Sequence, residues 1–250
     1  MPAVLRRRQH AQRREGLKPT LLQYAAAVGA PLLPVIAGVV RARFLTDARR
    51  AIVLWCAIEA SFNIIAIAIG SRGRNNLWLG YVGHPLLTMA LLWALAHWHP
   101  TKAAKLALKI AIPLVRLVSV VLTLALDDAS EISLAVVPFH AIVMLLATVW
   151  TFVSLSLKAE SSIVQEDWFW IIGGVMLYAA TAAAMQPLAW YLIRERVDLL
   201  HAAFNLRAAV VILSFAAITW GMLLRGAPRY SGGSSWPPSS PSSSSSAGLE

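Results

Sequence analysis

The sequence has little charge, a single cysteine and no long polar stretch between its two ends. Charged residues make up 14% of the 250 residues, against about 25% in ordinary soluble domains, while 58% of the residues are hydrophobic. A chain of 27.1 kDa has too little interior to bury so much apolar surface, which excludes a soluble globular protein. Cys56 has no second cysteine to pair with, which excludes a disulfide framework and a cysteine metal cluster.

Seven apolar stretches are each long enough to span a membrane, which takes about 20 residues. Short polar connections join them and leave no room for an extramembrane domain. The sequence therefore predicts an all-α fold, a polytopic membrane bundle of seven transmembrane helices over residues 21–225. The predicted spans are Leu21–Val40, Ala51–Gly70, Leu77–Trp98, Ala104–Leu126, Ile132–Leu157, Asp167–Ile193 and Val197–Leu224.

Two polar tails flank the predicted bundle. Residues 1–20 are rich in arginine, and residues 226–250 are a Ser/Pro/Gly tail that predicts a disordered linker, its last four residues being typical of a cloning scar. We call the membrane side that bears the N-terminus side A and the opposite side side B. Counted with the tails, both sides carry ten Lys and Arg, so the positive-inside rule returns a tie. Without the tails, eight lie in or beside the side B loops and four in the side A loops, which favours an N-terminus outside the cell, whereas the basic N-terminal tail favours the opposite orientation.

The net charge of +10 comes from 22 Lys and Arg against 12 Asp and Glu. In a soluble protein this excess would indicate nucleic acid, but in a membrane protein it is usually loop charge that contacts anionic lipid. The predicted partners are therefore the lipid bilayer and not nucleic acid.

Several polar residues lie inside the predicted spans, where an ionisable group is costly and needs a partner, a cavity or a function. Most lie seven to eleven residues from the side A end of their span, at one depth of roughly 10–15 Å. The side B halves of four spans carry no acidic or basic residue. This pattern predicts a polar chamber that opens towards side A, and its candidate ligand-binding residues are Glu59, Asn63, His84, Arg116, His140, Gln186, His201 and Asn205.

The leading interpretation is a binding or transport protein with a one-sided, cationic pocket for a small anionic solute or a lipid headgroup. Arg116 would neutralise the ligand, Glu59 would pair with His201, and the other imidazoles and amides would orient the ligand by hydrogen bonds without a cofactor. Arg116 also belongs to a polar stripe, with Lys105, Lys109, Thr123 and Asp127, that we expect to face the bundle interior. Arg207 lies about 200° around the helix from Asn205 and receives no role.

Two alternatives use the histidines differently, and they leave open whether the protein is an enzyme. In the first, His84, His140 and His201 bind zinc and Glu59 is the general base of an intramembrane hydrolase. In the second, two of the histidines are the axial ligands of a haem.

Specific residues separate the sequence from two seven-helix families and relate it to a third. The seventh span has no lysine for a retinal Schiff base, and it has His201 and Asn205 where seven-helix zinc hydrolases have a His-x-x-x-His pair. The run Asn75-Asn76-Leu77-Trp78-Leu79, followed by Pro85, resembles a segment of bacterial seven-helix membrane proteins of unassigned function. The resemblance implies the same helix count and a location in the bacterial inner (plasma) membrane.

Overall fold

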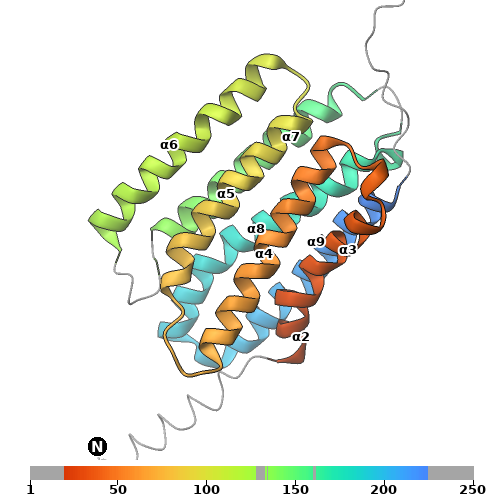
Figure 1. The fold of residues 1–250 in the computed structure, drawn as a ribbon. Helices are drawn as coiled ribbons and strands as arrows, with labels where there is room; N and C mark the ends of the chain where they lie inside the picture. The colour runs from red at the N-terminus through yellow and green to blue at the C-terminus, as the bar shows by residue number, and fades with distance from the viewer. Residues whose placement is uncertain (1–19, 128–132, 134, 160–161, 225–250) are drawn as a thin grey trace, which may run out of the picture.

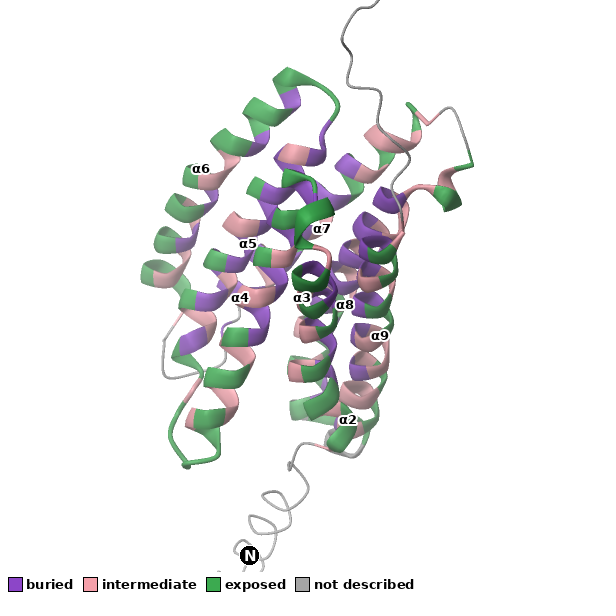
Figure 2. Ribbon diagram, turned by 45° about the vertical axis from the view of Figure 1, so that its right-hand side comes forward, coloured by how far each residue is buried: buried purple, intermediate pink, exposed green. Residues whose placement is uncertain are grey.

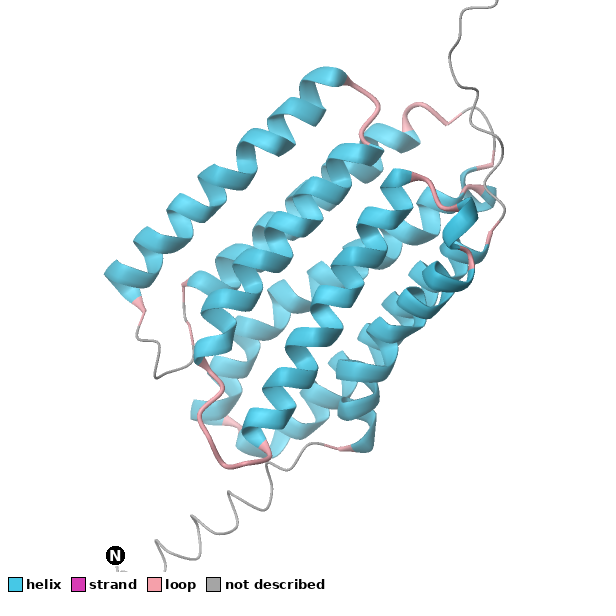
Figure 3. Ribbon diagram, in the orientation of Figure 1, coloured by secondary structure: helices cyan, strands magenta, loops and turns pink. Residues whose placement is uncertain are grey.

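The computed structural model describes residues 20–127, 133, 135–159 and 162–224 and confirms the seven-helix bundle. The seven spans are long and apolar enough to cross a membrane. Figures 1 and 3 show that they lie side by side as a helical bundle. The predicted tails lie outside the described residues, apart from Thr20.

The first span consists of three elements: α2 (Leu21–Tyr24), a π-helix (Ala25–Gly29) and α3 (Ala30–Val40). The other elements, in chain order, are a 3-10 turn (Ala42–Phe44), α4 (Asp47–Gly70), α5 (Trp78–Trp98), α6 (Lys102–Leu126), α7 (Val136–Ser156), a 3-10 turn (Ile163–Gln165), α8 (Asp167–Glu195) and α9 (Val197–Leu223).

Threonine caps set where three of the helices begin. The hydroxyl of Thr46 accepts a hydrogen bond from the Arg49 amide at 3.4 Å, so α4 begins four residues before the predicted span. Thr101 caps α6 in the same way, and Thr20 forms a capping box with Gln23 at the start of α2. Beyond α2 the backbone widens to π geometry, which occurs often at functional sites.

Six of the spans form a closed ring. Around it, α5 packs on α4, α4 on α3, α3 on α9, α9 on α8 and α8 on α7, and α7 returns to α5. The remaining helix, α6, lies at the edge of the bundle and packs mainly on α5 (Figure 1). Side A is at the bottom of Figure 1, where α2 begins.

Two glycines bring α8 and α9 into close contact. A Cβ atom on Gly174 would lie 2.6 Å from the carbonyl oxygen of Ser214, and one on Gly221 would lie 2.8 Å from the carbonyl oxygen of Asp167. Only glycine allows the two backbones to approach this closely, as is common between membrane helices. The contact lets α8 and α9 pack closely along one wall of the ring.

The predicted orientation of the polar stripe on α6 is wrong. Figure 2 shows most of α6 exposed, and Lys105, Lys109 and Arg116 are exposed side chains. The buried face of α6 consists of Ala104, Leu108, Val115 and Ser119. The first three lie one residue, or about 100° around the helix, before Lys105, Lys109 and Arg116. Because α6 has a neighbour on one side only, the stripe does not enter the ring.

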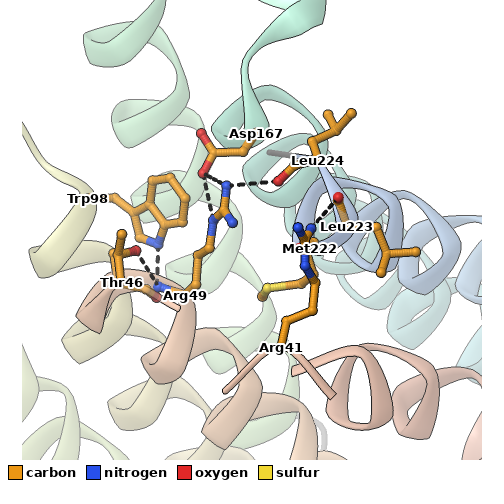
Figure 4. Close-up of polar contacts among 9 residues, drawn as sticks. Arg41, Thr46, Arg49, Trp98, Asp167, Met222, Leu223 and Leu224 are labelled. Carbon is orange, nitrogen blue, oxygen red and sulfur yellow. Dashed lines mark hydrogen bonds and ion pairs between the residues drawn. The ribbon is translucent and has the colours of Figure 1, made fainter. Parts of the chain in front are cut away.

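Two arginines tie the side B ends of α3, α4, α8 and α9 together (Figure 4). The buried Arg49 donates from Nε to Asp167 Oδ2 at 2.8 Å, and its Nη2 lies 2.6 Å from the same oxygen. Arg49 also donates to the Leu224 carbonyl, and Arg41 donates to the carbonyls of Met222 and Leu223. The arginines thereby satisfy carbonyl groups at the C-terminal end of α9, which lack partners within the helix.

Candidate functional site

Two adjacent cavities lie in the side A half of the ring. The larger has a volume of about 340 Å³, within the usual range for small-molecule sites, and the smaller about 160 Å³. The larger reaches the side A connections at Asn76 and Ser133, and the smaller lies against Ala26 and Ala27 of the π-helix. Four polar residues line both cavities: Glu59, Asn63, Tyr178 and Arg207.

Glu59 is held in place by two hydrogen bonds to one of its oxygens. Tyr178 donates its hydroxyl to Glu59 Oε1 across the ring at 2.7 Å, and Asn63 donates from Nδ2 to the same atom at 3.0 Å. Asn63 lies one turn along α4 from Glu59, so the two side chains share a helix face. Among the described residues Oε2 receives no hydrogen bond, so this oxygen is available to a molecule in the cavities.

Arg207 has no partner among the described residues. Its Nε is buried without a hydrogen bond, and the guanidinium forms no ion pair, not even with Glu59 on the shared wall. A guanidinium stays protonated in proteins. An unpaired cation is therefore part of the lining of both cavities.

Aromatic packing closes the ring on the side B flank of Glu59. Trp55 lies one turn further along α4 towards side B, with its ring 5.4 Å from that of Tyr178 and 6.0 Å from that of Phe215. Tyr178 and Phe215 also contact each other edge to face at 5.5 Å. All three side chains are buried, so they form a floor below the polar groups.

Four of the eight predicted site residues line the larger cavity, and these are Glu59, Asn63, His84 and Gln186. They come from α4, α5 and α8, which surround the side A half of the ring. Arg116 does not reach it, because α6 lies outside the ring. The cation that lines the cavity is instead Arg207.

His140 links three helices from a fully buried position. Its Nε2 lies 2.7 Å from Ser119 Oγ on α6, and its Nδ1 lies 2.9 Å from Thr88 Oγ1 on α5. Both ring nitrogens are engaged, so His140 would have to give up a hydrogen bond to bind zinc or a haem iron. Within the described part of the chain, no three His, Cys, Asp or Glu side chains gather closely enough to hold a metal ion.

The two polar residues predicted near the side A end of α9 are not in the cavity linings. Asn205 accepts hydrogen bonds from Thr20 at 2.9 Å and from Gln23 at 3.0 Å, which attaches α2 to α9. His201 forms no hydrogen bond or ion pair with the described residues. The expected Glu59–His201 pair is replaced by the bonds of Glu59 to Tyr178 and Asn63.

Two of the shared lining residues, Tyr178 and Arg207, lay outside the predicted set. Tyr178 falls in a stretch of α8 without acidic or basic residues, so charge alone gave no signal for it. The sequence gives Arg207 no predicted role because it faces away from Asn205. Asn205 points to α2, however, so facing away from it directs Arg207 into the ring. The relevant signal was the presence of an arginine in an apolar span.

At side B, outside the spans, His99 is buried between α5 and α6 at 3% exposure. Its Nδ1 accepts a hydrogen bond from the Thr101 amide at 3.5 Å, and its ring lies 4.8 Å from that of Trp150. Burial lowers the pKa of His99, and the positive charges of Lys158 and Lys105 lower it further.

Comparison of the chain with known protein families, with curated proteins and with solved structures found no match.

Proposed function

We propose that this integral membrane protein binds or transports a small solute, or a lipid headgroup, through an anionic group that contacts Arg207. The observation that carries the proposal is the unpaired guanidinium in the lining of both cavities. Arg207 is half-buried and its Nε is fully buried, and a charge withdrawn from water without a partner is unfavourable. An anionic group in the cavity would supply that partner, and His84, Asn63 and Gln186 would add hydrogen bonds from three other positions.

The aromatic floor would determine the side from which a ligand enters and what transport requires. Trp55, Tyr178 and Phe215 separate the cavities from the side B half of the ring, so a ligand would enter from side A. Transport would require the floor to open, whereas binding alone would not. Tyr178 belongs both to the floor and to the Glu59 contact, so it would link ligand binding to the floor.

Thermal unfolding of the full chain in a neutral detergent tests the proposal. The probes are inorganic phosphate, propanoate, β-alanine and O-phosphoethanolamine, which all carry an anionic group. We expect at least one of them to raise the melting temperature of the wild type, and Arg207→Gln to abolish the rise. Arg116→Gln is the matched control, since it removes an exposed arginine outside the cavities and should leave the rise intact.

The proposal is wrong if none of the four probes shifts the wild type and no phospholipid in nanodiscs binds it, or if Arg207→Gln responds as the wild type does. Arg207→Lys keeps the positive charge and loses the planar guanidinium. It should retain part of the shift, which separates loss of charge from loss of fold.

A further inference from the structure

The cavities contain one charged residue of each sign. Glu59 and Arg207 both line both cavities, and the remaining polar lining consists of amide, hydroxyl and imidazole groups. The sequence predicts a cationic pocket because that prediction includes Arg116. With Arg116 outside the ring, the charges of Glu59 and Arg207 cancel.

The framework keeps these opposite charges apart. In a medium of low dielectric constant a carboxylate and a guanidinium attract each other strongly. Glu59 is nevertheless held by Tyr178 and Asn63, and it forms no ion pair with Arg207. The two residues come from α4 and α9, and α3 packs against both of these helices. Glu59 therefore presents a negative group, and Arg207 a positive group, to the same space without the two neutralising each other in an ion pair.

A purely anionic ligand fits this space poorly. It would satisfy Arg207 but would add a second negative charge beside Glu59, and Oε2 would stay without a donor. A ligand that also carries an ammonium group satisfies both groups, because an ammonium supplies three donors and no acceptor. It also leaves the occupied site without net charge, which a membrane interior favours.

We infer that the ligand is a zwitterion, whose anionic group binds Arg207 and whose ammonium group binds Glu59 Oε2. The inference rests on the proposed function and specifies the ligand class for the same site. The shared chemistry is a primary ammonium a few bonds from a carboxylate or phosphate. A free amino acid has this arrangement, and so does an ethanolamine phosphate headgroup of a lipid.

Matched pairs of probes test the inference without any variant. Each pair differs only by the amino group: β-alanine against propanoate, and O-phosphoethanolamine against ethyl phosphate. A third pair, phosphatidylethanolamine against phosphatidylethanol in nanodiscs, distinguishes a lipid source from a soluble one. Calorimetric titration of the full wild-type chain should show at least about tenfold tighter binding of the zwitterion in one or more pairs.

Glu59→Gln should remove that preference while binding of the matched anion stays equal or becomes tighter. The loss for the zwitterion should be about 30-fold or more, as for the truncation of one partner of a buried charge pair. Asp47→Asn is the matched control, because it neutralises an exposed carboxylate on the same helix and should leave the preference unchanged.

The outcomes separate the two proposals. Equal affinity within every pair, or a preference that persists in Glu59→Gln, overturns the zwitterion and leaves a site for anions at Arg207 if Arg207→Gln abolishes their binding. Absence of binding by all six probes overturns the proposed function together with the inference. A preference confined to the nanodisc pair supports the inference and assigns the zwitterion to a lipid headgroup.

Discussion

The Arg49–Asp167 pair at side B gives the sharpest stability prediction. Both side chains are 7% exposed, and one carboxylate oxygen accepts from Nε at 2.8 Å and lies 2.6 Å from Nη2 (Figure 4). Asp167→Asn keeps the shape of the side chain and removes its charge. The Arg49 guanidinium then stays buried without a counter-charge, with only neutral acceptors: the new amide oxygen at position 167 and the Leu224 carbonyl, at 3.3 Å.

The expected cost is set by the charge that is left behind. Removing one partner of a buried ion pair destabilises a protein by about 3–5 kcal/mol, because the remaining charge is uncompensated. In a chain of this size each kcal/mol lowers the melting temperature by about 2–4 °C, so the melting temperature should fall by about 10 °C. The double variant Arg49→Met/Asp167→Leu has no orphaned charge, so it should be more stable than either single neutralisation.

The control variant, Asp47→Asn, lies on the same turn of α4 as Arg49. Asp47 and Arg50 form an exposed pair at 3.5 Å, with side-chain exposures of 82% and 59%, and pairs of this kind contribute about 0–1 kcal/mol. Thermal unfolding in detergent should therefore show almost no change for Asp47→Asn. If Asp167→Asn is as stable as Asp47→Asn, or if the double variant is the least stable of the set, the reasoning about buried charge is wrong.

Three further predictions concern a glycine contact, a buried histidine and a histidine near side B. Gly174→Ala should lower the free energy of unfolding by about 1–3 kcal/mol, because its Cβ would lie 2.6 Å from a carbonyl oxygen on α9. His140→Ala should lower it by about 3 kcal/mol, because it leaves a cavity and removes two hydrogen bonds. His99 should make the protein less stable below about pH 6.5, since the unfolded chain then binds more protons than the folded one.

Each of these predictions has its own check. Gly173→Ala should unfold like the wild type, since its Cβ would meet nothing closer than 3.9 Å, and equal losses for both glycines would contradict the close-contact explanation. Thr88→Val removes one hydroxyl contact of His140 and should cost about 1 kcal/mol, clearly less than His140→Ala. Between pH 7.5 and pH 5.5 the melting temperature of His99→Gln should fall less than that of the wild type, and parallel curves would exclude His99 as the source.

The fold was predictable because its main determinant is local. A run of about 20 apolar residues must form a helix in a membrane, since lipid offers its backbone no hydrogen bonds. The spans could therefore be read from the order of residues, with errors at their ends. Those errors arise from single side chains, such as the Thr46 cap that starts α4 early.

The candidate site was only partly predictable because it depends on the order of the helices around the ring. Counting depth along each span correctly grouped Glu59 and His84, which line one cavity. Depth does not say which way a side chain points. Arg116 and Arg207 lie at nearly the same depth, but Arg207 lines the larger cavity and Arg116 is exposed outside the ring. The difference is that α6 packs outside the ring and α9 within it, a long-range contact that no single span encodes.

Contact between the ligand and Arg207 is the central claim, and a magnetic-resonance distance tests it most directly. The experiment uses the full chain labelled with ¹⁵N-arginine in bilayers and measures dipolar coupling from the guanidinium nitrogens to the phosphorus of O-phosphoethanolamine. We predict a coupling that corresponds to about 4 Å, present in the wild type and in Arg116→Gln and absent in Arg207→Gln. A coupling that survives in Arg207→Gln and disappears in Arg116→Gln would contradict this assignment of the site.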